Sequence, residues 1–330
     1  MKNLFVVRTP LQLINALEAK YHFKTQNNIL IVVYSVNQTD KEQMNKIINE
    51  KDWNEIIKLN QKGKKSIFFE YIKLIKKLQK EPVDKLFIVF FKGLQKLFIS
   101  NIRTKETYLI DDGLASLKIQ SELPQLIQRG NLIKELRYRI VGLKTEITKI
   151  PDFFTAYNLT SYPNQKVIQN DYRYLKTLLK SSSNSKNYIY LLGQTLIKPH
   201  IITQAYYITK LQEIKKYFKD KKIIYIPHRD EQANDLQYIK EKLEDENFIV
   251  QTSKGAIEME FIINGVYPKT IVSFFTSALI NLEKIFNTSE IYAVHLKSNE
   301  IHERKEAIEA CYLEIEKNTN IQVIESLRHP

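Results

Sequence analysis

Cysteine and glycine are scarce in this chain of 330 residues, and each scarcity excludes a class of site. The single cysteine, Cys311, can form neither an internal disulfide framework nor a cysteine-based zinc cluster. Only 8 glycines are present, and the absence of a G-x-G-x-x-G or Walker pattern argues against a dinucleotide or P-loop site. No apolar run reaches membrane-spanning length, and the run at residues 4–7 is too short for a signal peptide. We therefore expect a cytoplasmic protein.

Acidic residues are also in short supply, but only in one half of the chain. Residues 1–186 carry 32 Lys and Arg against 17 Asp and Glu, whereas residues 187–330 carry 18 and 20. The formal net charge of +13 therefore comes from the first half. The positive charge of residues 1–186 predicts an anionic partner for this half. Nucleic acid, anionic lipid headgroups and a phosphorylated glycan are each candidates.

What the sequence does contain is an alternation of strand and helix patterns in both halves. In the first half we predict strands at 4–8, 29–35, 85–91, 106–110, 153–158 and 166–169, with helices at 10–21, 40–59, 66–80, 124–141 and 171–180. In the second half we predict strands at 188–193, 222–227, 247–251, 270–275 and 290–295, with helices at 202–218, 230–243, 256–263, 276–287 and 300–317.

Such alternation predicts an α/β fold of two Rossmann-like, doubly wound domains. The small polar residues at 181–187 are the best linker in the chain, which places the domains at 1–183 and 184–330. Two such domains enclose an interdomain cleft, where ligands commonly bind.

The stretch at residues 222–231 is the most informative in the second half. A short apolar strand ends at Pro227, and Asp230 and Glu231 are expected to open the next helix. His228 and Arg229 then lie at the carboxyl end of a strand, which is where ligands bind in open α/β sheets. This position suits a site that holds a phosphate, although a histidine at a strand end is equally often a structural hydrogen-bonding residue.

Asp111 and Asp112, followed by Gly113, form an acidic pair directly after a strand in the first half. Adjacent carboxylates at such a point can supply a general base, and their mutual repulsion tends to raise one pKa. Asp-Gly is also a common turn pair, so an acidic turn is the alternative. No third carboxylate at a metal-binding spacing is evident, so we expect no metal site and no cofactor.

Further polar residues follow strands or begin helices in the second half. Thr276 and Ser277 begin a helix after a strand, where hydroxyls and free N–H groups form an anion site, although an ordinary N-cap explains one of them. Glu258 begins another helix and could hold a ribose diol, unless it is only a favourable first-turn charge. Gly193 and Gln194 end a further strand and are candidate donor-binding residues.

Taken together these residues resemble the bacterial sialyltransferases, and most closely the lipooligosaccharide sialyltransferases of glycosyltransferase family 52. The resemblance extends in order over most of the chain. The residues that carry it are Val6-Val7-Arg8-Thr9-Pro10-Leu11-Gln12, Asp111-Asp112-Gly113, Pro227-His228, Glu258 and Thr276-Ser277.

This resemblance implies a GT-B fold, a CMP-sialic acid donor and metal-independent inversion at the anomeric carbon. By the same likeness, one residue of the acidic pair deprotonates the acceptor, and His228 donates a bond or proton to the departing phosphate. Thr276 and Ser277 would hold that phosphate, Glu258 the ribose, and Thr9 would also contact the donor.

One departure from the family pattern concerns the residue after the histidine. The family signature has proline there, whereas this chain has Arg229, which either adds a phosphate contact or indicates a different donor.

We therefore expect a sialyltransferase, peripheral to the inner membrane, that modifies a lipooligosaccharide or capsular glycan, with a homodimer left open. The alternatives are a GT-B enzyme that uses another nucleotide sugar, and a basic nucleic-acid-binding protein suggested by the pI near 9.4. The neutral second half and the lack of a recognised RNA or DNA motif argue against nucleic acid.

Overall fold

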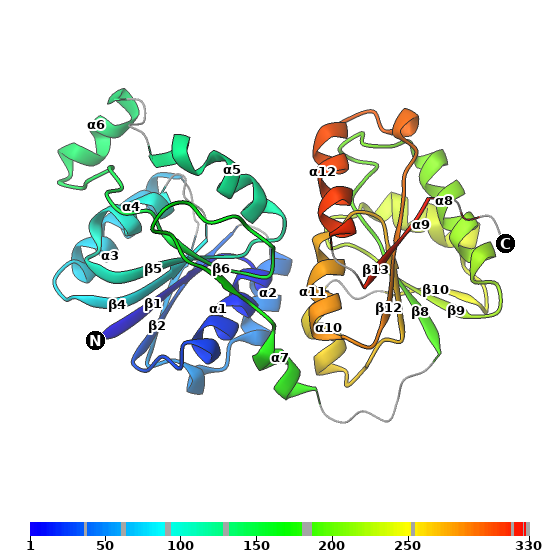
Figure 1. The fold of residues 1–330 in the computed structure, drawn as a ribbon, viewed down its shortest axis with the longest axis horizontal. Coiled ribbons are helices and arrows are strands. Elements are labelled where there is room, and N and C mark those ends of the chain that lie inside the picture. The colour runs from blue at the N-terminus through cyan, green and yellow to red at the C-terminus, as the bar shows by residue number, and fades with distance from the viewer. Residues whose placement is uncertain are drawn as a thin grey trace. The chain divides into compact units, whose positions relative to one another are not determined.

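The computed structural model describes residues 1–35, 38–60, 64–89, 94–127, 132–179, 187–251, 255–317, 320–325 and 327. The chain divides into two compact units, Met1–Tyr174 and Leu175–Pro330. Each unit is built around one parallel sheet with helices on both faces (Figure 1). The division falls before the predicted boundary at 183/184, which lies in the linker, and residues 180–186 of that linker are outside the described residues.

The sheet of the first unit has seven parallel strands in the order β3-β2-β1-β4-β5-β6-β7. Its strands are β1 (Lys2–Val7), β2 (Asn28–Tyr34), β3 (Glu55–Asn60), β4 (Val83–Ile88), β5 (Thr104–Ile110), β6 (Asp152–Thr155) and β7 (Val167–Gln169). Its helices are α1 (Pro10–His22), α2 (Gln38–Ile47), η1 (Glu50–Asp52), α3 (Lys64–Leu78), α4 (Leu94–Asn101), α5 (Ala115–Ile127) and α6 (Leu132–Ile140). Helix α7 (Arg173–Leu178) spans the division between the units.

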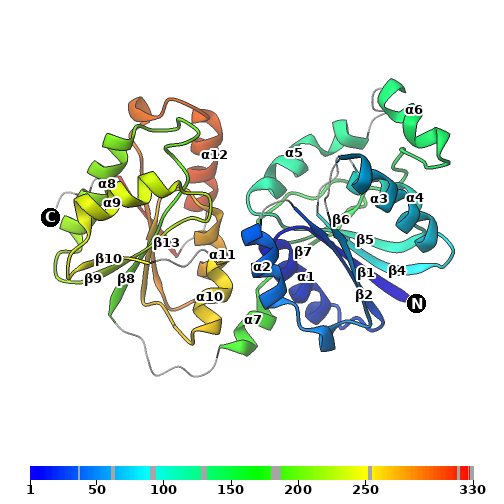
Figure 2. The ribbon, with the colours of Figure 1, turned by 180° about the vertical axis from the view of Figure 1, so that it is seen from behind.

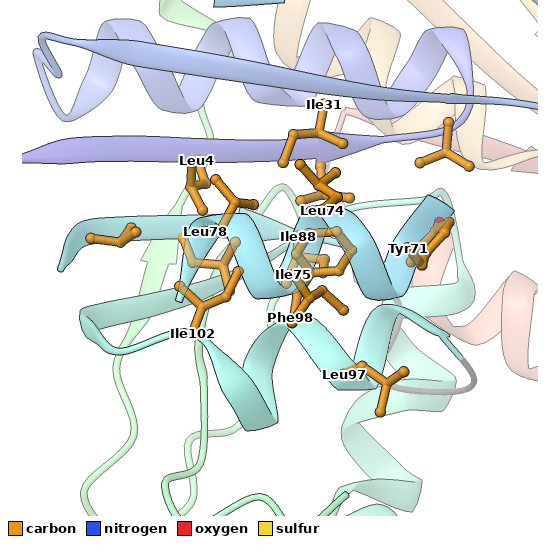
Figure 3. Close-up of a cluster of buried hydrophobic side chains, with 14 of the residues drawn as sticks. Leu4, Ile31, Tyr71, Leu74, Ile75, Leu78, Ile88, Leu97, Phe98 and Ile102 are labelled. Atoms are coloured by element: carbon orange, nitrogen blue, oxygen red, sulfur yellow. The ribbon is translucent and has the colours of Figure 1, made fainter. Parts of the chain in front are cut away.

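Strand periodicity explains how this sheet is covered on both faces. Leu4 and Val6 of β1 join the core formed with α3, α4 and α5, whereas Phe5 and Val7 join the core formed with α1 and α2. Figure 3 shows side chains of α3 and α4 meeting Leu4 and Ile31 from the sheet. Burial of each such side chain contributes roughly 1.5–3 kcal/mol, so both faces help to fix β1 in the interior of the sheet.

The second unit repeats the architecture with six parallel strands in the order β10-β9-β8-β11-β12-β13. Its strands are β8 (Tyr188–Leu192), β9 (Lys222–Ile226), β10 (Phe248–Val250), β11 (Thr270–Ser273), β12 (Glu290–Val294) and β13 (Ile321–Ile324). Its helices are α8 (Gln204–Tyr217), α9 (Ala233–Leu243), α10 (Ile257–Ile263), α11 (Ser277–Ile285), η2 (Ser298–Glu300) and α12 (Lys305–Glu316). Helices α8 and α9 cover one face of the sheet, and α10 and α11 cover the other (Figures 1 and 2).

Several predicted element boundaries were wrong. The helix predicted at 40–59 is α2 followed by the edge strand β3, which pairs with β2 from Glu55 to Asn60. The helix predicted at 124–141 covers the end of α5 and the separate helix α6, while α4 and β13 were not predicted. Among the described residues, no helix is both long and apolar enough to cross a membrane.

Candidate active site

The acidic pair of the first unit follows β5, one of the inner strands of the sheet. Gly113 adopts a φ of +60°, a left-handed conformation that favours glycine, and this lets the chain turn into α5. The predicted acidic turn is therefore present, and it presents two neighbouring carboxylates at the carboxyl edge of a parallel sheet.

Asp111 is the buried member of the acidic pair, with 2% of its surface exposed. Its carboxylate accepts hydrogen bonds from Ser116 Oγ at 2.6 Å, Thr155 Oγ1 at 2.7 Å and the backbone N–H of Ala156 at 2.6 Å. Burial raises the pKa of Asp111 to about 6, although the three donors act in the opposite direction. These contacts tie α5 and the segment after β6 to the end of β5, so Asp111 acts in the structure as a tether.

Asp112 is only partly buried and is therefore the carboxylate that a ligand can reach. Thr9 Oγ1 lies 3.4 Å from its Oδ1 and also accepts the N–H of Gln12 at 3.3 Å as the N-cap of α1. Asn15 of α1 adds a bond to the carbonyl of Asp111 at 3.0 Å. The structure thus brings Thr9 and the acidic pair together at the point where β1 ends and α1 begins.

In the second unit, the strand order reverses between β8 and β11, which is the topological switch point of this sheet. The loops after β8, β9 and β11 are connected by hydrogen bonds at its carboxyl edge. Gln194, after β8, accepts the backbone N–H of Phe275, after β11, at 3.1 Å. Thr195 Oγ1, also after β8, lies 3.0 Å from His228 Nδ1, after β9.

His228 lies within this cluster of loops with 41% of its side-chain surface exposed. Its Nδ1 also accepts the backbone N–H of Asp230 at 3.2 Å. Desolvation lowers the pKa of His228 from its ordinary value, Arg229 lowers it further, and Asp230 acts in the opposite direction. The imidazole is therefore biased toward its neutral form.

Asp230 and Glu231 do not open a helix, and that prediction was wrong. Helix α9 begins at Ala233, and the carboxylate of Glu231 turns inward instead, where 6% of the residue is exposed. It accepts the backbone N–H of His228 at 2.5 Å and the hydroxyl of Tyr225 at 2.6 Å. The two hydrogen bonds that the buried Glu231 carboxylate accepts stabilise the chain more than its charge would in the first turn of a helix. Glu231 therefore holds the backbone of His228 in place.

Gly193 allows this arrangement, because a Cβ at that position would lie 2.3 Å from Glu231 Oε2 and 2.4 Å from the Tyr225 hydroxyl. The Tyr225 hydroxyl lies 2.9 Å from that of Tyr207, which accepts the N–H of Gln194 at 3.2 Å. The structure therefore places Gly193 and Gln194 in the network that supports His228.

Sequence reasoning missed Thr195, Glu231 and the two tyrosines. The signal for Thr195 was available, since it follows the predicted strand end by two residues. The roles of the tyrosines could not be read from the sequence, because both resemble ordinary core residues.

Thr276 and Ser277 lie where α11 begins, as predicted, and both are partly exposed. Thr276 is the N-cap, and its Oγ1 accepts the N–H of Ala278 at 3.3 Å. The first turn of α11 contains no acidic residue, so its N–H groups and the Ser277 hydroxyl can serve an anion.

Glu258, in the first turn of α10, is 5% exposed and accepts a hydrogen bond from Asn281 of α11 at 2.9 Å. Burial raises its pKa, while Asn281 and the charge of Arg229 favour the ionised form. Arg229 therefore lies close enough to interact electrostatically with both His228 and Glu258. Across the described ranges no three His, Cys, Asp or Glu side chains gather into a group that could hold a metal ion.

Several solved structures share this fold. A putative UDP-N-acetylglucosamine 2-epimerase from Listeria monocytogenes has a TM-score of 0.58 at 14% identity, covering 94% of this chain and 82% of that one. The UDP-GlcNAc 2-epimerase from Methanocaldococcus jannaschii has a TM-score of 0.54 at 15% identity, covering 98% and 89%. These likenesses extend over both units, and the predicted two-domain fold of the GT-B type is confirmed.

A family model described as alpha-2,8-polysialyltransferase (POLYST) matches residues 3–295, which includes both candidate clusters. No curated protein matches the chain. The predicted resemblance to sialyltransferases is confirmed by this match, while the narrower assignment to the lipooligosaccharide group stays a prediction. The chain belongs to the alpha-2,8-polysialyltransferase family and is thus a glycosyltransferase.

Proposed function

We propose that this chain transfers sialic acid from CMP-sialic acid to the terminal sugar of a glycan, with inversion and without a metal ion. The observation that carries this proposal is the cluster at the switch point of the second unit, where His228, Arg229 and the start of α11 offer donors to a phosphate. The family match supports sialic acid as the transferred sugar. We assign CMP as the nucleotide of the donor.

The proposed reaction needs a base, and we assign this role to Asp112. It is the partly exposed member of the acidic pair, whereas the oxygens of Asp111 are occupied by Ser116, Thr155 and Ala156. Asp112 removes the acceptor hydroxyl proton as that oxygen attacks the anomeric carbon.

The leaving group is CMP, and negative charge develops on its phosphate as the glycosidic bond breaks. We assign stabilisation of this charge to His228, Arg229, Thr276 and Ser277, because donors aimed at developing charge lower the barrier. Glu258 is assigned to the ribose, and Asn281 fixes its orientation. Thr9, Gly193 and Gln194 support these groups through the contacts described above.

The acceptor that the family description supports best is a glycan that already ends in sialic acid, as in a capsular polysaccharide. Such a polyanion suits the positive charge of residues 1–186, and so does an anionic inner-membrane surface. Basic and apolar side chains are exposed on the first unit, among them Lys77 of α3, Lys118 of α5, and Leu136 and Ile140 of α6. We propose peripheral association of this unit with the cytoplasmic face of the membrane.

A donor panel tests the proposal against a GT-B enzyme that uses another nucleotide sugar. The chain is incubated with CMP-sialic acid or with UDP- and ADP-sugars, plus acceptors ending in sialic acid or galactose, with and without EDTA. We expect acceptor-dependent release of CMP only, unchanged by EDTA, and fastest with the sialylated acceptor. Preferential use of a UDP- or ADP-sugar would contradict the assigned donor, and faster transfer to galactose would instead favour a lipooligosaccharide acceptor.

A further inference from the structure

The two nitrogens of the His228 ring have different surroundings. Nδ1 lies 3.2 Å from the backbone N of Asp230, whose N–H points to it, and 3.0 Å from the hydroxyl of Thr195, which can donate or accept. A backbone N–H can only donate, so Nδ1 must present its lone pair to keep this bond. In the neutral ring the proton then resides on Nε2.

The Nε2 edge makes no hydrogen bond with any described residue. Since 41% of the side-chain surface is exposed at the carboxyl edge of β9, an N–H at Nε2 remains available to a ligand. The ring is thus held through Nδ1, and no described residue bonds to Nε2.

Desolvation of the ring acts against its protonation and outweighs the charged groups around it. Desolvation and Arg229 lower the pKa of His228, and Asp230 raises it, but Asp230 Oδ2 lies 3.8 Å from Nδ1, beyond hydrogen-bond distance. The nearby Glu231 carboxylate is directed to the backbone N–H of His228 and to the Tyr225 hydroxyl. Protonation at Nδ1 would also remove the acceptor of the Asp230 N–H.

We propose that His228 acts as a neutral hydrogen-bond donor through Nε2–H, and that Thr195 is the positioning residue that keeps the proton on Nε2. The identity of the group that receives this bond, the phosphate of the departing nucleotide, rests on the proposed function.

The proton balance of the reaction is consistent with a neutral donor. The bond between the anomeric carbon and the phosphate oxygen breaks with its electron pair on oxygen, while the acceptor proton passes to Asp112. The second pKa of a phosphate monoester is about 6, so the leaving group departs near neutral pH without taking a proton. His228 therefore has only to stabilise charge, and no proton transfer from the ring is required.

The tautomer can be measured without reference to activity. In ¹⁵N-histidine-labelled protein, with His228→Ala used for assignment among the 6 histidines, we expect the Nε2–H form between pH 7 and 8.5. Thr195→Val, which removes the hydroxyl but keeps the shape, should produce a mixture of tautomers, and Thr195→Ser should restore the single form. An Nδ1–H or doubly protonated ring at pH 7.5 would overturn the proposal, whatever the donor sugar proves to be.

Turnover provides the second measurement, with thermal melting used to confirm that each variant is folded. His228→Ala should lose about a hundredfold or more in kcat, whereas His228→Gln, which keeps a neutral N–H near Nε2, should lose about tenfold. Thr195→Val should lower kcat about tenfold with little change in KM, and kcat/KM of the parent chain should not fall between pH 7 and 8.5. Equal losses in the two His228 variants, together with a fall in kcat/KM above pH 7, would indicate proton donation instead.

Discussion

At the scale of single residues, two neighbouring aspartates have different surroundings, and we therefore assign only one of them as the base. Asp111 is buried and accepts three short hydrogen bonds, while Asp112 is partly exposed beside the N-cap of α1. The sequence predicted the pair but left the base open, because adjacent residues in a turn can point in opposite directions. Burial distinguishes them, and burial depends on the packing of α5 and of the segment after β6.

The pKa of Asp111 predicts how stability depends on pH. In the folded chain this pKa is about 6, above the ordinary 3.8, so the folded state holds this proton more tightly than the unfolded state. The stability that it contributes is full below about pH 4 and is lost as the pH rises through about 6. The loss is at most about 3 kcal/mol, since each pKa unit corresponds to about 1.4 kcal/mol.

Urea unfolding of the parent chain and of Asp111→Asn between pH 4 and 7.5 measures this effect. The amide oxygen of asparagine can accept the Ala156 N–H while its NH2 group donates to the two hydroxyls, so we expect a folded variant. As the pH rises, the unfolding free energy of the parent chain should fall relative to that of Asp111→Asn. A difference that is constant with pH would show that Asp111 is already ionised at pH 4.

At the scale of helices and strands, the residues that begin or end an element predicted its position better than the pattern of residues within it did. The helix starts at Pro10 and at Thr276-Ser277, and the strand that ends before Pro227, are where the sequence places them. Edge strand β3 was mistaken for helix because its residues, Glu55–Asn60, are mostly polar or half-buried, and only pairing with β2 makes them a strand. The inward turn of Glu231 could not be predicted either, since it depends on the space that Gly193 leaves in the loop after β8.

That dependence makes Gly193→Ala a test of the loop network. The new methyl group would collide with the Glu231 carboxylate and the Tyr225 hydroxyl, so we expect a loss of about 1–3 kcal/mol in unfolding free energy and a clear fall in kcat.

The matched control is Gly142→Ala. No atom lies within 4 Å of a Cβ at this position, and only its φ of +76° opposes the substitution. It should cost about 1 kcal/mol and leave kcat unchanged. If Gly193→Ala behaves like this control in both measurements, Glu231 does not need the close approach that the structure shows.

At the scale of the whole molecule, the two units carry different parts of the proposed reaction. The first unit holds Thr9 and Asp112 in the basic half of the sequence, and the second unit holds His228 and the start of α11. The fold class was predictable because strand and helix patterns alternate throughout the chain. The linker composition predicted a boundary at 183/184, whereas the chain divides after Tyr174, whose N–H donates to Glu18 of the first unit at 2.9 Å.

The central claim is that Asp112 of the first unit and His228 of the second serve one sialyl transfer. Its most direct test is the rate of sialic acid transfer from CMP-sialic acid by Asp112→Asn, His228→Ala and the double variant, with melting temperatures as controls. We expect each single variant to lose about a hundredfold or more, and the double variant to lose less than the product of the two, because both residues act on the same transition state. Transfer within threefold of the parent rate by either folded single variant would contradict the account.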